Sequence, residues 1–200
     1  MYASDLFEYK QKGNGVILIW RNRFVFAIGK DQYWDKTTDP WTITYTNTGG
    51  HVESQETVIE ATRREVKEEL GCNVEILPSE QTLYCSLEDR KFTKQKLNDT
   101  IPPLLIYNSA IIKMSVSVFF ARILVEPKPH LEVPALLLLP PSLIGGGQLS
   151  ELLNNGALLK EQVESSIPRS ANLHPFGSAE LLAVYYEKFN AIANFNQYFV

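Results

Sequence analysis

Three glutamates near the end of one predicted helix are the residues of this sequence best suited to chemistry. Glu65, Glu68 and Glu69 belong to the stretch REVKEEL. At ~100° per residue they fall within about 100° of one another on a helix, so the carboxylates are neighbours in space. Their repulsion and their opposition to the helix dipole each cost a few tenths to about 1 kcal/mol. A hard divalent cation reverses both effects, because it takes oxygen ligands. The cluster therefore predicts a metal site, and a solvated acidic surface is the alternative that the stretch alone leaves open.

The helix that positions these acids is expected to run from about Gln55 to Leu70. Ser54 is the expected N-cap, and Gly71 is the natural stop because glycine readily adopts the left-handed conformation that ends helices. Glu56 falls in the first turn, where a negative charge suits the helix dipole. The expected buried stripe consists of Ile59, Val66 and Leu70.

A longer pattern surrounds the acids. From Gly50 the segment has glycine, five residues, Glu56, seven residues, and then REVKEELGC, which ends at Cys72. This resembles the Nudix box, GX5EX7REUXEEXGU, in which U is a bulky apolar residue. All of its fixed positions match. The departures are Cys72, which is small for its position, and Gln55, where many members of the family have glycine. Neither departure falls on an expected metal ligand.

The resemblance implies the fold and the reaction of the Nudix hydrolases. The fold class would be α/β (α+β), with a mixed curved β-sheet between α-helices. The reaction would be hydrolysis, dependent on Mg²⁺ or Mn²⁺, of a nucleoside diphosphate linked to another moiety. The resemblance also implies that Glu65, Glu68, Glu69 and the carbonyl of Gly49 would hold the metal.

Two further residues of the pattern acquire roles from the resemblance. Arg64 would hold the carboxylates in position, and Glu56 would support the loop or an ordered water. Arg64 could equally be a helical i,i+4 partner of Glu60 or Glu68, and both roles are compatible. Many relatives add an acid from a loop after the later strands. By order along the chain Glu132 is the favoured candidate and Glu126 the second, with plain loop surface as the alternative for either.

Candidate substrate contacts precede the box. Tyr33 and Trp34 lie in a polar loop, where a nucleotide base could stack on them, whereas Trp20 and Trp41 are expected to pack in the core. Arg23 is a candidate phosphate contact, although a cation in a turn is usually just solvated. These residues are the expected substrate-binding set.

The rest of the chain predicts alternating strands and helices. Residues 1–147 are expected to form the Nudix core, and residues 148–200 a helical extension packed on the same domain. The expected strands are Gly15–Trp20, Phe24–Gly29, Trp41–Thr46, Asn73–Leu77, Thr82–Leu87, Ser109–Lys113, Ser115–Leu124 and Ala135–Leu139. The expected helices of the extension are Leu149–Leu153, Leu158–Val163 and Ala179–Ile192.

Composition narrows the class of protein. A net charge of −4 argues against a nucleic-acid-binding surface, and no apolar stretch is long enough to span a membrane. Two cysteines without CxxC spacing, and no secretory signal, predict a cytoplasmic protein. The alternatives to an enzyme are a Nudix-fold sensor of a nucleotide metabolite, which the complete box disfavours, and an interaction scaffold. In a scaffold the C-terminal helices would form the surface of a homodimer.

Overall fold

A mixed β-sheet organises the chain in the computed structural model, which describes residues 1–130, 133–162 and 166–189. Within these ranges the strands are β1 Gln11–Trp20, β2 Arg23–Ile28, β3 Thr42–Thr46, β4 Val74–Leu77, β5 Thr82–Ser86, β6 Thr93–Gln95, β7 Leu105–Ser109, β8 Met114–Ile123, β9 Ala135–Leu139, β10 Gly147–Gln148, β11 Leu158–Glu161 and β12 Asn172–Pro175. The helices are α1 Val58–Leu70, α2 Leu149–Asn154 and α3 Ser178–Phe189, with short 3₁₀ turns η1 Ala3–Leu6, η2 Asp31–Tyr33 and η3 Pro141–Leu143.

The long strands β1 and β8 form the centre of this sheet. They run parallel, in a register that extends from Gln11 opposite Met114 to Ile19 opposite Arg122. The hairpin partner β2 is antiparallel to β1, and β9 and β3 both pair with β2. The loop before α1 runs antiparallel alongside β1, with bridges between Val16 and Thr48 and between Gly13 and His51. Strand β1 therefore supports the loop that begins the Nudix box.

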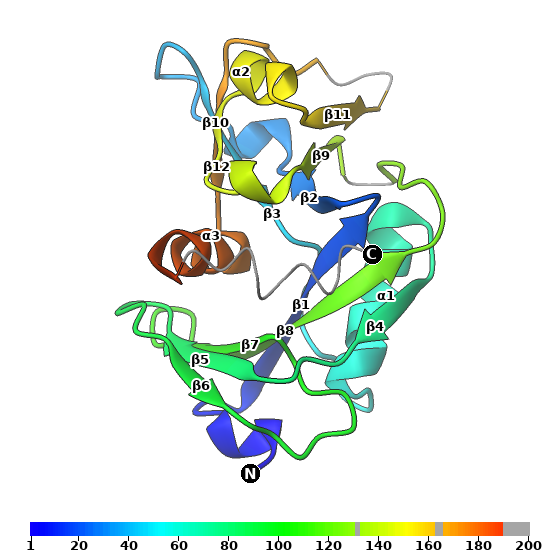
Figure 1. Cartoon of the computed structure of the whole chain (residues 1–200), viewed down its shortest axis with the longest axis vertical. Helices are drawn as coiled ribbons and strands as arrows, with labels where there is room; N and C mark the ends of the chain where they lie inside the picture. The colour runs from blue at the N-terminus through cyan, green and yellow to red at the C-terminus, as the bar shows by residue number, and fades with distance from the viewer. Residues whose placement is uncertain (131–132, 163–165, 190–200) are drawn as a thin grey trace.

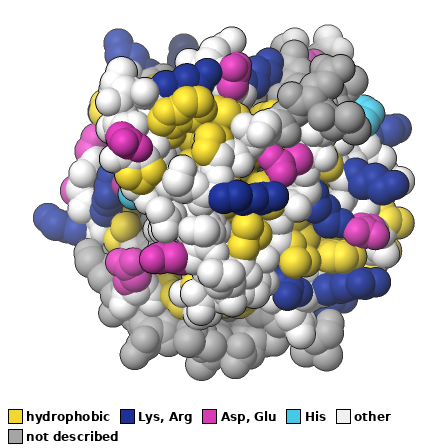
Figure 2. Space-filling view, turned by 90° about the horizontal axis from the view of Figure 1, so that it is seen from above, with side chains coloured by type: hydrophobic (Ala, Val, Ile, Leu, Met, Phe, Trp, Pro, Cys, Tyr) yellow, Lys and Arg dark blue, Asp and Glu magenta, His cyan; other side chains and the backbone are white. Residues whose placement is uncertain are grey.

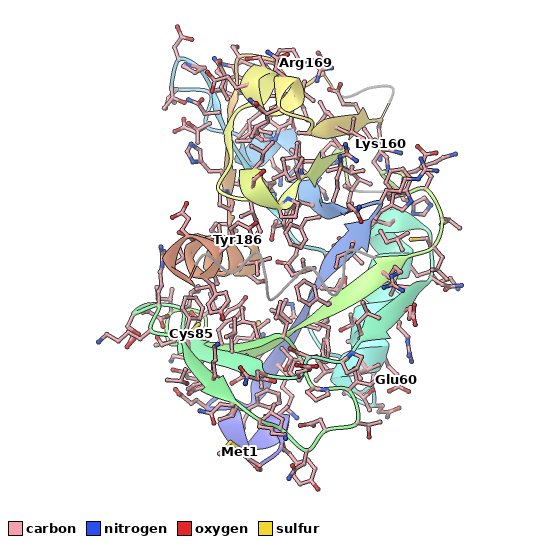
Figure 3. The ribbon with its side chains drawn as sticks, in the orientation of Figure 1. Met1, Glu60, Cys85, Lys160, Arg169 and Tyr186 are labelled. Atoms are coloured by element: carbon pink, nitrogen blue, oxygen red, sulfur yellow. The ribbon has the colours of Figure 1, made fainter. Side chains whose placement is uncertain are left out.

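The two long helices, α1 and α3, cover opposite faces of the sheet around β1 (Figure 1). Alternate residues of a strand point to opposite faces. Val16 and Leu18 of β1 accordingly belong to the same apolar cluster as Val66 and Leu70 of α1. Ile17 and Ile19 belong to the cluster that includes α3. Figure 3 labels two further members of that second cluster, Tyr186 on α3 and Cys85 on β5. No helix in the described ranges has the length and hydrophobicity needed to cross a membrane.

The expected mixed α+β class is confirmed, and two element boundaries are corrected. Helix α1 begins after Thr57 and not after Ser54, because Thr57 and Glu60 form a reciprocal capping box. The Thr57 hydroxyl accepts from the Glu60 amide at 3.2 Å, and the Glu60 carboxylate accepts from the Thr57 amide at 2.7 Å. The expected strand Ser109–Lys113 is wrong, because β7 ends at Ser109 and a turn follows in which Lys113 has a φ of 51°.

The segment after residue 147 contains strands as well as helices, and the expected helix Leu158–Val163 is wrong over its described residues. Helices α2 and α3 form where helices were expected, but Leu158–Glu161 is strand β11, paired antiparallel with β9. Strand β12 runs parallel to β3 and adds to the central sheet. Every residue of β9 is buried, so its free edge needs a hydrogen-bonding partner, and pairing overrides the local helical pattern of β11. The boundary at residue 147 stays a prediction.

Glu88, in the loop after β5, accepts hydrogen bonds that are expected to make the stability of the fold depend on pH. Glu88 accepts hydrogen bonds from the hydroxyls of Ser86 and Ser109, at 2.8 and 2.9 Å, and from the amide of Ala110 at 2.9 Å. These bonds, that of Ser86 foremost, lower the pKa of Glu88 to about 2. A lowered folded-state pKa stabilises the fold above the unfolded value near 4.5, and this contribution is lost as the pH falls toward 2.

Glu88→Gln is therefore expected to lower the midpoint of urea unfolding at pH 7, and to lower it progressively less as the pH falls from 5 towards 2. The measurement is a urea titration of wild type and variant at several pH values in this range. Glu80→Gln, at an exposed position in the loop before β5, is the control and is expected to unfold like the wild type. A deficit of Glu88→Gln that was the same at every pH would contradict the prediction.

Candidate active site

The acidic residues meet where the end of α1 lies beside the loop that joins β3 to α1. The loop is held on β1 by the Val16 amide, which donates to the Thr48 carbonyl at 2.9 Å, and by the Asn14 amide, which donates to the Gly50 carbonyl at 2.9 Å. Helix α1 ends at Gly71, whose φ of 65° is the left-handed conformation expected there. The last two turns of α1 thus present their carboxylates beside a fixed stretch of backbone.

Arg64 joins the loop to the helix. Its guanidinium donates to Glu56 at 2.8 and 3.2 Å, to Glu65 at 2.9 Å and to Glu68 at 3.2 Å. It also donates to the backbone carbonyl of His51 at 3.0 Å. The structure therefore brings together four of the predicted site residues, Glu56, Arg64, Glu65 and Glu68. The expected helical i,i+4 pair of Arg64 with Glu68 is present, as one of several contacts of Arg64. Glu60, the other helical partner considered for Arg64, is engaged in the capping box.

These contacts affect the acid–base properties of the group. The hydrogen bond with Arg64 is the main cause that lowers the pKa of Glu56, and the Glu53 amide adds to it. The same bond with Glu56, together with Glu65, raises the pKa of Arg64. Arg64 is therefore a permanent cation, and its hydrogen bonds orient its partners.

Glu69 makes no ion pair with Arg64 in the described part of the chain and is half-buried. The Thr48 hydroxyl and the Gly49 amide lie close to its carboxylate and favour its charged form. Burial is the main cause that raises the pKa of Glu69 to about 7, and the charges of Glu65 and Glu68 raise it further. A carboxylate in this position lacks a positive partner among the described residues and has two negative neighbours, which is the electrostatic situation that a bound cation relieves.

Two glycines allow the loop to approach both α1 and β1. A Cβ atom on Gly50 would lie 2.3 Å from a carboxylate oxygen of Glu65. A Cβ atom on Gly49 would lie 2.3 Å from the backbone oxygen of Asn14 and 2.7 Å from the Cα atom of Gly15. A side chain at Gly49 would push the loop away from the backbone of β1, whereas one at Gly50 would displace the Glu65 carboxylate.

The donor set suits a hard cation. Three carboxylates and a backbone carbonyl offer only oxygen ligands, which Mg²⁺ and Mn²⁺ prefer. In the described part of the chain no three acidic, histidine or cysteine side chains are already gathered as a ligand set. The contacts explain this arrangement, because Arg64 binds Glu65 and Glu68 while Glu69 faces Thr48 and Gly49.

The predicted acids outside the box have different positions. Glu132 lies outside the described residues. Glu126 forms an ion pair with Lys160 of β11, which Figure 3 labels, and Lys160 also lies 4.9 Å from the ring centre of Trp20. The hydrogen bond with Lys160 is the main cause that lowers the pKa of Glu126. Glu126 thus has a structural partner of its own.

The predicted substrate residues are not linked to the acids by any hydrogen bond or ion pair in the described ranges. Tyr33 is 68% exposed. The Trp34 indole donates to the Gly29 carbonyl at 2.7 Å, and its ring lies 6.4 Å from that of Trp41, so Trp34 is held by the core. Arg23 donates to the carbonyl of Gly156 at 3.1 Å. Of the three, Tyr33 has the side chain most accessible to a ligand.

Two residues that contact the acids or the end of α1 were not predicted from the sequence. Thr48 supports Glu69, and His130 covers the end of α1. The His130 amide donates to the Glu69 carbonyl at 3.2 Å, and its Nδ1 lies 3.0 Å from the Glu68 carbonyl. Carbonyls in the last turn of a helix lack partners within the helix. The sequence holds a signal for Thr48, which directly precedes Gly49, but none that brings His130 to α1.

A cavity of about 1020 Å³ lies beside the first turns of α1. Its walls combine apolar side chains with cations and acids, among them Phe7, Lys12, Ile59, Glu60, Arg63 and Asp99, and it reaches Glu56. Over the face seen in Figure 2, cations and acids are interspersed with apolar side chains. The charge on that face therefore indicates no single class of macromolecular partner.

Comparisons with known proteins agree with this geometry. Residues 6–104 match the family model of the NUDIX domain. Among solved structures, a hydrolase of the NUDIX family from Clostridium perfringens is 18% identical, with a TM-score of 0.46, and the alignment covers 67% of this chain and 83% of that one. A NUDIX hydrolase from Nitrosomonas europaea is 19% identical, with a TM-score of 0.40. That alignment covers 66% of this chain and 58% of the other, so the chain spans less than two thirds of that protein. No curated protein matches the sequence.

The matched region contains the complete box, the loop that precedes it and α1. The match, the fold and the site together identify residues 6–104 as a Nudix domain.

Proposed function

We propose that this protein hydrolyses the P–O–P bond of a nucleoside diphosphate linked to another moiety, with Mg²⁺ or Mn²⁺ as cofactor. The observation that carries the proposal is Glu69, a half-buried carboxylate beside Glu65 and Glu68 whose pKa is raised to about 7. The Thr48 hydroxyl and the Gly49 amide of the loop lie next to it. A half-buried acid in such surroundings suits a functional site better than a solvated surface.

Each residue of the site has a role in this reaction. Glu65, Glu68, Glu69 and the Gly49 carbonyl would hold the cation. When bound, the cation would neutralise the diphosphate oxygens and make a bound water a better nucleophile at neutral pH. Arg64 keeps Glu65 and Glu68 oriented and ties them to Glu56 and the loop. Because these groups are oriented before the substrate binds, little reorganisation is needed during the reaction.

Further parts of the proposal lie beyond the box. Glu132 is proposed as the additional acid, and Tyr33 as a stacking contact for the base, since its ring is exposed. The partner is a small nucleotide-derived substrate and not a nucleic acid, which is consistent with the net charge of −4. We place the protein in the cytoplasm, with a homodimer as its proposed assembly.

Removal of divalent metal is expected to abolish activity. Purified protein treated with EDTA should release no phosphate product from any member of a panel of nucleotide sugars, dinucleotides, oxidised nucleotides and isoprenoid diphosphates. Addition of Mg²⁺ or Mn²⁺ in excess of the chelator should restore turnover of at least one of them, whereas Ca²⁺, which accepts less regular coordination, should restore less. The measurement is product release under saturating substrate.

The same panel separates the enzyme from a nucleotide sensor. An enzyme turns over a substrate that it binds once metal is added. Calorimetric binding of a panel member with metal present, without any product release, would contradict hydrolysis and support the sensor.

A further inference from the structure

The N-terminus of α3 reaches the loop of the Nudix box through a buried hydrogen bond. The Ser178 hydroxyl donates to the Asn47 side-chain carbonyl at 2.6 Å, across 131 positions of sequence. Ser178 is 5% exposed and Asn47 is 6% exposed. Polar groups that are buried to this extent rely on each other, because water cannot replace a lost partner.

The contact continues toward the acids. The Asn47 side-chain amide donates to the Thr48 carbonyl at 3.0 Å, and Thr48 is 1% exposed. The Thr48 hydroxyl and the Gly49 amide in turn lie close enough to the Glu69 carboxylate to lower its pKa. Two hydrogen bonds thus link Ser178 through Asn47 to Thr48, and Thr48 is next to Glu69; we call this series of contacts the Ser178 relay.

Neighbouring elements hold both ends of the relay in place. Strand β12 pairs with β3, and the Phe176 amide donates to the Tyr45 carbonyl at 2.9 Å. These bonds place the start of α3 beside the end of β3. The Tyr107 side chain of β7 also lies beside Ser178. A Cβ atom on Gly15 would lie 2.4 Å from the Asn47 side-chain nitrogen, so the absence of a side chain there leaves room for Asn47. The relay is therefore bordered by Gly15 of β1, Tyr107 of β7 and the start of α3.

We propose that Ser178 is a positioning residue, which acts through Asn47 to hold Thr48 and Gly49 in the arrangement that orients Glu69. The segment after residue 147 then has a part in activity, although it lies outside the matched region 6–104. The role of Glu69 in metal binding rests on the function proposed above. The contact between α3 and the loop does not.

The test compares three substitutions in the full chain. Ser178→Ala removes the donor, and Ser178→Thr retains a hydroxyl. Ser150→Ala is the matched control, because the Ser150 hydroxyl bonds Gln148 at 3.1 Å in the same C-terminal segment but away from the loop. Hydrogen exchange of the peptide that spans Thr48–Gly50 reports the position of the loop. Mn²⁺ affinity by electron paramagnetic resonance, together with kcat and KM, reports the consequence for the acids.

Ser178→Ala is expected to speed exchange at Thr48–Gly50 and to lower Mn²⁺ affinity and kcat by about 10–100-fold, the effect typical of partners behind metal ligands. KM is expected to stay within about twofold of the wild-type value, because the relay does not touch the proposed stacking residue. Ser178→Thr should recover most of the loss, and Ser150→Ala should behave like the wild type. If Ser178→Ala does not fold, Ser178→Cys, with only a weak donor, replaces it.

Exchange at Thr48–Gly50 that is equal in Ser178→Ala and Ser150→Ala overturns the proposal, whatever the activity. Faster exchange with unchanged Mn²⁺ affinity and kcat in an active enzyme also overturns it. A wild type that neither binds Mn²⁺ nor hydrolyses any substrate refutes the proposed function instead, and faster exchange in Ser178→Ala then still supports the positioning of the loop.

Discussion

Glu69→Gln is expected to lower kcat by at least about 100-fold, the scale of loss found when one preorganised charged or polar group is removed from an active site. Glutamine has nearly the same shape, so the core beneath α1 should be unaffected. The variant loses the negative charge that a cation would neutralise. Its amide nitrogen cannot serve as an oxygen ligand, and as a donor it would lie beside the N–H group of Gly49, which is itself a donor. Kcat at saturating substrate and Mg²⁺, together with Mn²⁺ affinity, measures the effect.

The control for this substitution is Glu75→Gln on β4, which removes an exposed carboxylate that lies 3.7 Å from Arg122. This variant should retain wild-type turnover, since exposed ion pairs contribute little. Thermal unfolding of both variants checks that the fold is intact. Full activity of folded Glu69→Gln would remove Glu69 from the mechanism and, with it, the observation that carries the proposed function.

Gly49→Ala is expected to have the second largest effect. The new Cβ atom would lie 2.3 Å from the Asn14 carbonyl oxygen and 2.7 Å from the Gly15 Cα atom. Both are backbone atoms of β1, which is held by β8 along nearly its whole length, so the loop must move instead. Overpacking of this kind costs about 1–3 kcal/mol of stability. A displacement of the metal-site backbone by about 1 Å can lower kcat by ~100-fold.

Gly147→Ala separates the steric clash from the cost of backbone conformation. Gly147 has a φ of 141° and Gly49 a φ of 157°, but a Cβ atom on Gly147 meets nothing closer than Leu152 at 3.9 Å. We expect Gly147→Ala to keep near-wild-type kcat, and Gly49→Ala to lose both kcat and stability in urea. Equal loss in the two variants would show that backbone conformation, and not the approach of the loop to β1, explains the effect.

The helix and its acids could be predicted because their signals are local. Helical spacing places Glu65, Glu68 and Glu69 together, whatever the rest of the chain does. Gly71 ends the helix because glycine readily adopts the left-handed backbone conformation found there. The error at the start of α1 was also local. Ser54 and Thr57 are both good N-caps, and the reciprocal bonds between Thr57 and Glu60 decide between them.

Strand β11 and the supports of Glu69 could not be predicted in this way. The LLKE stretch is compatible with a helix by its own propensity, and it is a strand because the buried edge of β9 is available to it. Likewise, nothing near Asn47 in sequence indicates that Ser178 is its partner. Trp34 and Tyr33 are adjacent in sequence, yet only packing decides that one is held by the core and the other is exposed.

The sequence by itself determined the Nudix box, the acidic end of α1 and the oxygen-rich chemistry of the site, because these depend on residue type and on spacings of a few positions. The tertiary structure alone decided which carboxylates Arg64 binds, how deeply Glu69 is buried, and that the C-terminal segment reaches the loop. These features depend on contacts between distant parts of the chain. Such contacts form only when the whole sheet has folded, so local sequence patterns do not indicate them.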